Sequence, residues 1–196
     1  MTADLLPKTI RRDYEVQESK HACAVLCHDF PEEWANIIDV LSCFKLKKSE
    51  IAAPGGGKSL ISSFLDEEFK KRGWNKKKFD TEVRVDGKSR ANPTHEIDCF
   101  KNRVALEIEW NNKDPFYDRD LNNFRILFEL GAISAGVIIT RCDELQEIFD
   151  GLGKGDSYGA STTHMSKLRP RIDGGGAGGC PVLVFGISRR LYLKGE

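Results

Sequence analysis

The chain has 196 residues, 40% of them hydrophobic and 31% charged, and no run approaches the ~20 apolar residues that a membrane-spanning helix needs. Its 30 basic residues balance its 30 acidic residues, which argues against a strongly basic protein that coats nucleic acid without specificity. No basic start followed by a long apolar core opens the sequence, so we expect no secretory signal, no membrane partner and a cytoplasmic location.

Six cysteines lie scattered through apolar surroundings, and in a reducing compartment we expect them to be buried free thiols. Cys23, Cys27 and His28 form the one cluster with the look of metal ligands. A structural zinc site usually needs a second pair at matching spacing, and none is present, so no zinc site is predicted.

The first half of the chain is predicted to be helical, beginning with a helix at about 14–28. A second helix is expected from 32 to 44, where one continuous apolar stripe is formed by Trp34, Ile37, Ile38, Leu41 and Phe44. After a break at 52–57, a third helix is predicted to begin near Leu60 and to end near Gly73.

The apolar spacing changes to alternation at about Thr81, which predicts strands. One strand is expected at 82–85, followed by an Asp86-Gly87 turn, and two more at 96–100 and 103–110 form a hairpin or meander.

Further along, the sequence predicts an alternation of helices and buried strands. Helices are expected at 117–131 and from Asp143 to Phe149, and short β-branched runs predict buried strands at 135–140 and 181–187. Between them, the stretch from 151 to 179 holds nine of the 18 glycines and is predicted to be a long functional loop, with a floppy surface loop as the alternative.

Three carboxylates are predicted to converge on the hairpin. Glu107 and Glu109 share one face of their strand, and a tight hairpin brings Asp98 beside Glu107. Such groups repel one another, and a divalent cation that prefers hard oxygen ligands, with Mg²⁺ the natural candidate, is the usual reason to keep them together. The alternative is that both glutamates lie on the solvated face of an edge strand.

The order D-x8-E-x-E, followed by a helix, a buried strand and a second helix, resembles the PD-(D/E)xK nuclease fold. Within that superfamily the chain is most similar to type II restriction endonucleases of the BglII, BstYI and BamHI branch. The helix ending Phe69-Lys70-Lys71-Arg72-Gly73-Trp74, the strand Arg103–Glu107 and the run Cys180–Ile187 carry the resemblance over residues 55 to 187.

This resemblance implies an α/β fold with a central mixed sheet flanked by helices, in a single domain with a helical part at 1–54 and a catalytic core at 55–196. It implies Mg²⁺-dependent, site-specific cleavage of a short palindrome in double-stranded DNA by a homodimer. The implied catalytic residues are Asp98, Glu107 and Glu109, and the implied metal ligands are Asp98, Glu107 and Ile108. Glu68, Ser62 and Ser63 are the candidates for a further residue contributed by the preceding helix.

Two features depart from the superfamily pattern. Glu109 stands where most members have a lysine, and it resembles the glutamate of the BamHI pattern. Lys113, four residues further on, is a candidate to supply the missing charge. Ile97 stands before Asp98 in place of proline.

DNA contacts are expected from donors and acceptors suited to base edges and phosphates. The candidates are Asn111, Asn112, Lys113, Ser161, Thr162, Thr163, His164, Arg169 and Arg171. A basic run is a further candidate for phosphate contacts, formed by Lys70, Lys71, Arg72, Lys76, Lys77 and Lys78.

Other functions are less consistent with the sequence. The stretch Gly55–Ser59 resembles part of a phosphate-binding loop, but Ala52 replaces the first glycine, so no nucleotide cofactor is expected. His95 lies near Asp98, yet the other histidines are distant in sequence, which disfavours a histidine-metal nuclease. A structure-selective or repair nuclease of the same fold and a non-catalytic DNA-binding module remain as alternatives.

Overall fold

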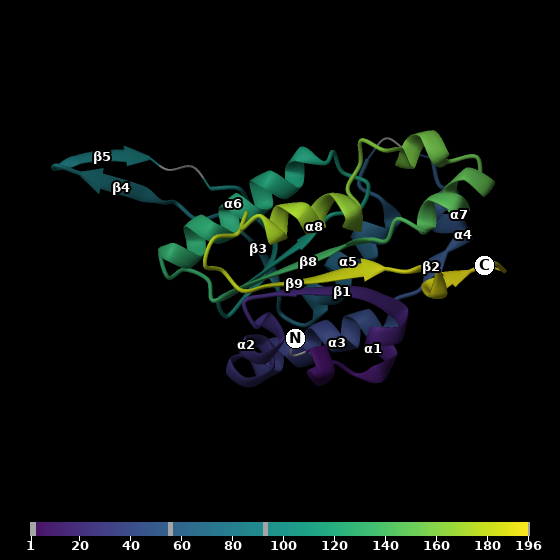
Figure 1. Cartoon of the computed structure of the whole chain (residues 1–196), viewed down its shortest axis with the longest axis horizontal. Helices are drawn as coiled ribbons and strands as arrows, with labels where there is room; N and C mark the ends of the chain where they lie inside the picture. Colours follow the sequence, from purple (N-terminus) through teal and green to yellow (C-terminus); the bar gives the residue numbers. More distant parts are fainter. Residues whose placement is uncertain (1–2, 55–56, 92–93, 196) are drawn as a thin grey trace.

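A computed structural model gives the structure of the protein and describes residues 3–54, 57–91 and 94–195. At its centre is a six-stranded sheet (Figure 1). Its strands in spatial order are β1 (Tyr14–Ser19), β9 (Val182–Ile187), β8 (Ala135–Arg141), β7 (Val104–Ile108), β6 (Ile97–Lys101) and β3 (Asn75–Lys77).

The sheet is mixed. Strands β7, β8 and β9 run parallel to one another, whereas β6 is antiparallel to β7, β3 to β6, and β1 to β9. The β6–β7 hairpin predicted from the sequence is confirmed. So is the predicted fold class, a central mixed sheet flanked by helices.

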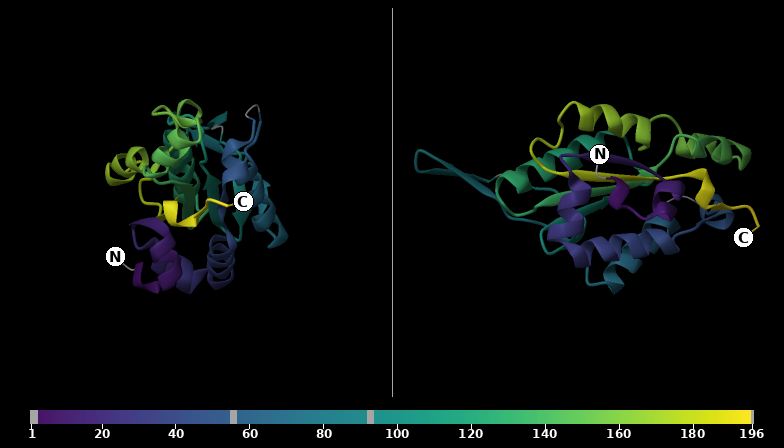
Figure 2. Two further views of the ribbon diagram at one scale, coloured as in Figure 1. Left: turned by 90° about the vertical axis from the view of Figure 1, so that its right-hand side faces the viewer. Right: turned by 60° about the horizontal axis from the view of Figure 1, so that its bottom comes forward.

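Helices cover both faces of this sheet, as the two views of Figure 2 show. The helices that come before the sheet's central strands are α1 (Lys8–Asp13), α2 (Ala22–Asp29), α3 (Pro31–Cys43), α4 (Lys48–Ala52) and α5 (Leu60–Lys71). Those that follow β7 are α6 (Pro115–Glu129), α7 (Leu145–Gly151) and α8 (Met165–Asp173). The short strands β2 (Leu46–Lys47) and β10 (Tyr192–Leu193) pair separately.

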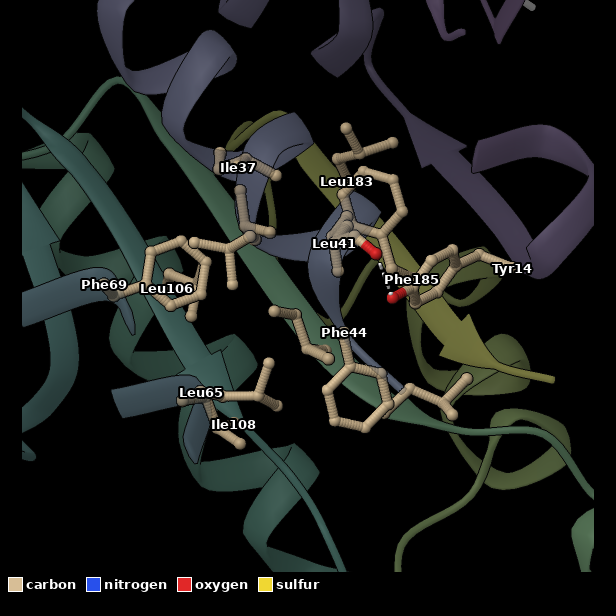
Figure 3. Packing of buried hydrophobic residues seen from close by; sticks show 14 of the residues in the cluster. Tyr14, Ile37, Leu41, Phe44, Leu65, Phe69, Leu106, Ile108, Leu183 and Phe185 are labelled. Atoms are coloured by element: carbon tan, nitrogen blue, oxygen red, sulfur yellow. Dashed lines mark hydrogen bonds between the residues drawn. The ribbon is translucent and has the colours of Figure 1, made fainter. Parts of the chain in front are cut away.

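One core lies between the sheet and helices α3 and α5 (Figure 3). The predicted apolar stripe of α3 supplies part of it, and the strands supply Leu106, Ile108, Leu183 and Phe185. The hydroxyl of Tyr14 on β1 donates a hydrogen bond to the Leu41 carbonyl near the end of α3, at 2.7 Å. This bond and the surrounding apolar contacts fix α3 against the edge of the sheet.

A second core lies under α6 and α8 on the opposite face. Leu121 and Phe124 of α6 and Leu168 of α8 are fully or almost fully buried there against Ile138 and Val184. This is also the face of β7 that carries Glu107, so α6 forms the cover of the carboxylate group.

Two sequence predictions about secondary structure are wrong. Residues 14–19 form strand β1, not the start of a helix, because Tyr14 and Val16 alternate with polar residues and the segment pairs along β9. The helical part predicted at 1–54 therefore contributes a strand to the sheet. The predicted loop at 151–179 contains helix α8, which packs Met165 and Leu168 into the second core.

The predicted turn at Asp86-Gly87 is confirmed, and it joins strands β4 (Glu82–Val85) and β5 (Lys88–Ala91). Asp86 and Gly87 both have positive φ, at 49° and 77°, as a two-residue hairpin turn of this kind requires. Figure 1 shows this hairpin projecting from the body of the protein, and every residue of its strands is exposed.

The six cysteines are free thiols, as predicted. Cys43 is exposed and Cys27 is half-buried, so the prediction of burial is wrong for these two. Within the described ranges, the structure contains no helix with the length and apolar character needed to cross a membrane.

Candidate active site

The β6–β7 hairpin brings Asp98 and Glu107 together, and each side chain bonds to the backbone of the opposite strand. The amide of Asp98 donates to Glu107 Oε2 at 3.2 Å, and the amide of Ile108 donates to Asp98 Oδ2 at 3.1 Å. The backbone pairing of the two strands runs from Lys101 with Val104 to Cys99 with Leu106. Beyond that point, two carboxylates accept hydrogen bonds from the strand amides.

Glu107 is a buried acid with an unused ligand atom. Its side chain is 1% exposed, and its Oε1 atom has no hydrogen-bond partner. Burial raises the pKa of Glu107 well above its ordinary value, and the nearby negative charges of Asp120 and Asp98 raise it further. A divalent cation would give this buried oxygen a partner and would reduce the repulsion among the neighbouring negative charges.

Glu109 lies immediately beyond the end of β7 and is also buried. Burial, followed by the charge of Asp120, raises the pKa of Glu109 to about 9. A protonated Glu109 beside Asp120 avoids placing two buried negative charges together. Glu109 Oε2 also accepts from Asn112 at 3.0 Å, and Arg119 lies 3.7 Å from Oε1.

Asp120 and His95 complete the group on the α6 side. Asp120 is fully buried on α6, burial raises its pKa, and its Oδ2 atom has no partner. One ligand atom from each of His95, Glu107 and Asp120 lies within 4.8 Å of the other two. Burial, followed by the charge of Arg119, lowers the pKa of His95 and so favours the neutral ring that a metal ion requires.

Asp98 borders open space. It lines a cavity of about 280 Å³ at the end of β7, together with Ile108 and Trp110. It also lines a second cavity of about 460 Å³, beside Asp66 of α5. Lys76 lines both, so the accessible edge of the carboxylate group has acidic ligands and a positive charge within the same space.

The structure also locates the candidates from the preceding helix. Ser62 of α5 lines the smaller cavity with Asp98. Glu68 lines neither cavity and forms ion pairs with Lys71 and Arg72 of its own helix. Asp66, which was not among the predicted residues, forms an ion pair with Lys58.

The segment that follows Glu109 is held by the loop before α8. The Thr163 hydroxyl donates to the Glu109 carbonyl at 3.1 Å and accepts from the Asn112 amide at 3.2 Å, and the Thr163 amide donates to the Asn112 carbonyl. Thr163 is fully buried and Thr162 is 8% exposed. Thr163, a predicted DNA-contacting residue, therefore supports the backbone of the site in this structure, and Thr162 is buried beside it.

The remaining residues predicted to contact DNA fall into two groups. His164 is paired with Asp143 at 2.6 Å, Arg171 with Asp118 at 2.8 Å, and Arg169 with Glu15. The second group comprises Lys113 and Ser161, whose side chains are exposed, and Asn111 and Asn112, which line the cavity with Asp98. Lys113 does not line that cavity, whereas Lys58 and Lys76 do.

Sequence reasoning missed Asp120 and set His95 aside. The signal for Asp120 was its place on the apolar side of a helix, between Tyr117 and Phe124, where a charged residue is unexpected. His95 was discounted because no second histidine lies nearby, but its partners are carboxylates from β7 and α6.

Comparison with known proteins supports a nuclease assignment over most of the chain. The family model described as restriction endonuclease BglII/BglIII matches residues 14–187. The match begins at the first residue of β1 and ends at the last residue of β9, so it covers the whole six-stranded sheet. Among curated proteins, no match was found.

Proposed function

This chain belongs to the BglII/BglIII family of restriction endonucleases, which are site-specific DNA-cleaving enzymes, and we propose that it uses Mg²⁺ to cut a short palindromic duplex as a homodimer. Family membership favours this reading over the repair nuclease and the non-catalytic module that the sequence left open. The observation that supports the metal is the pairing of Asp98 with Glu107, in which one buried glutamate oxygen has no partner.

In this proposal Asp98, Glu107 and the main-chain carbonyl of Ile108 hold the ion. A bound Mg²⁺ would supply Lewis acidity toward the scissile phosphate and would acidify a water molecule. Asp98 is the ligand that reaches the cavity, and Glu107 supplies the buried side of the site. The amide of Ile108 orients the Asp98 carboxylate by donating to Oδ2.

We assign Glu109 the handling of the proton from the attacking water. The pKa of Glu109 is about 9 without metal, so its carboxyl group holds a proton at neutral pH. A nearby divalent cation lowers the pKa of a carboxyl group, which would make Glu109 a proton acceptor. Lys76, at the cavity edge, supplies a positive charge near the phosphate.

The homodimer follows from the substrate. One chain offers one such group of catalytic acids, whereas a duplex cut needs two strand breaks. A two-fold dimer on a palindrome gives each strand its own site.

The test is incubation of the purified protein with a long unmethylated viral DNA in Mg²⁺, in EDTA, and with Glu107→Gln in parallel. Discrete fragments in Mg²⁺ alone are expected. Glu129→Gln, at an exposed position at the end of α6, is the matched control and should cut like the wild type. A smear would show that cleavage is non-specific and would contradict site specificity. Intact DNA in every lane would count against catalysis on this substrate.

A further inference from the structure

The cluster of His95, Glu107 and Asp120 lies on the inner side of the carboxylate group, between β7 and α6. Glu107 and Asp120 are 1% and 0% exposed, whereas Asp98 borders the cavities. Glu107 is therefore common to two groups of potential ligands. One faces the cavity with Asp98, and the other faces α6 with Asp120 and His95.

Unpartnered polar atoms gather on the inner side. Glu107 Oε1, Asp120 Oδ2 and Asn123 Oδ1 are all buried and have no hydrogen-bond partner. Asn123 follows Asp120 by three residues, so the two share a face of α6. Its amide nitrogen donates to the His95 carbonyl at 3.2 Å, which fastens the segment before β6 to the same helix face.

Buried oxygens are almost always satisfied by protein, water or an ion, and unpartnered oxygens on two members of one three-residue cluster indicate an occupant. The ligand atoms of His95, Glu107 and Asp120 lie within 4.8 Å of one another. Three ligands at about 2.1 Å from one ion can all be at most ~3.6 Å apart, so a closure of at most roughly 1.2 Å for each pair would bring all three into coordination.

We propose that His95, Glu107 and Asp120 bind a second divalent ion, of the transition-metal class that accepts imidazole, behind the Mg²⁺ site proposed at Asp98. One imidazole with two carboxylates suits Mn²⁺ or Zn²⁺ better than Mg²⁺, which prefers oxygen ligands and keeps several waters. Glu107 is the ligand common to the two positions.

This site goes beyond the proposed function, and it does not depend on cleavage. The experiment is a Mn²⁺ titration of metal-free protein without DNA, followed by electron paramagnetic resonance, in which bound Mn²⁺ loses the six-line signal of the free ion. Two ions per chain are expected for the wild type. Spin-echo modulation from an imidazole nitrogen is expected on one of them.

Variants separate the two positions. His95→Gln and Asp120→Asn should each keep one ion and lose the imidazole modulation, with the affinity of the inner site falling at least ~100-fold. Asp98→Asn should keep the ion that carries the modulation, and Glu107→Gln should weaken both. His28→Gln, an exposed histidine on α2, is the control and should bind two ions with the modulation intact.

A wild type that binds one ion, removed by Asp98→Asn, would overturn the inner site. So would a His95→Gln protein that titrates like the wild type. Thermal unfolding of each metal-free variant shows whether it has folded, and Asp120→Asn tests the same site if His95→Gln does not fold. Cleavage assays in Mg²⁺ are run separately, so a wild type that binds two ions but cuts no DNA would refute the proposed function and leave the inner site standing.

Discussion

Asp98 and Glu107 exchange side-chain hydrogen bonds across the end of the β6–β7 hairpin, with each carboxylate accepting from an amide of the opposite strand. The two acids thus terminate regular strand pairing and are fixed by it. Because the hairpin itself positions them, their geometry does not depend on a loop.

Removing either acid should abolish cleavage while the protein stays folded. Asp98→Asn and Glu107→Gln are expected to reduce the rate of DNA cleavage in Mg²⁺ at least ~100-fold, since both remove a ligand charge from the ion. Glu107→Gln should also raise the melting temperature of the metal-free protein, because it replaces a buried acid surrounded by like charges. Gel assays and thermal unfolding measure the two effects, and a cleavage rate within a few-fold of wild type would show that these acids are not the ligands.

The metal-free protein should lose stability as pH rises from 7 to 9. The pKa of Glu109 is about 9 in the folded chain, against an ordinary value of 4.5, so in this range the folded state holds a proton that the unfolded state has released. The free energy of unfolding therefore falls as pH rises towards the pKa of the acid in the folded chain. The raised pKa values of Glu107 and Asp120 act in the same direction.

Urea unfolding in EDTA at pH 7, 8 and 9 measures this slope. Glu109→Gln should flatten it, because the amide does not titrate. A free energy of unfolding that is constant or increases across this range in the wild type would contradict the pKa assignment.

Lys70 and Lys76 should contribute to DNA binding through phosphate charge. Both are exposed residues that line the cavity shared with Asp98 and Asp66. Replacing each with glutamine should weaken binding similarly for all sequences and reduce the salt dependence of log K by about one per lost contact. Binding of a labelled duplex in Ca²⁺ at several salt concentrations tests this, with Lys20→Gln, at the β1–α2 turn, as the control. An unchanged dependence of log K on salt would show that these two lysines do not contact DNA phosphates.

Tyr14→Phe should destabilise the fold without touching the site. The substitution leaves the buried carbonyl of Leu41 without its donor, which costs about 1 kcal/mol and lowers the melting temperature by roughly 2–4 °C. Tyr192→Phe, at a half-buried position near the end of the chain, should have a smaller effect. Equal melting temperatures for the two variants would mean that the Tyr14 bond contributes little.

Local patterns predicted the elements whose signal is strong and continuous. The apolar stripe on α3 and the β-branched runs of β8 and β9 predicted the bounds of these elements closely. Strand β1 was misread because its two apolar residues, Tyr14 and Val16, are followed at once by a helix, and the pairing with β9 that decides the matter is about 170 residues away. Helix α8 was missed because it contains Pro170 and is followed directly by a run of glycines.

The site residues also divide into those that local sequence patterns predict and those that long-range packing brings together. Asp98 and Glu107 were found because a hairpin is a local structure, and spacing alone places them together. Asp120 reaches Glu107 only through the packing of α6 on the sheet, and the burial of Thr163 depends on its bonds to Glu109 and Asn112. Neither fact is encoded in the residues around those positions.

The β4–β5 hairpin is a place where a protease can cut the chain while the sheet holds the two fragments together. Two exposed strands without further support are marginally stable, and Arg84, Lys88 and Arg90 stand on them as cleavage sites for trypsin. A cut there would divide the chain between β3 and β6, yet each fragment contributes strands to one sheet, with β3 paired to β6 and β1 paired to β9. The nicked protein should therefore remain a single particle, and the two halves, made as separate polypeptides, should be able to rebuild it.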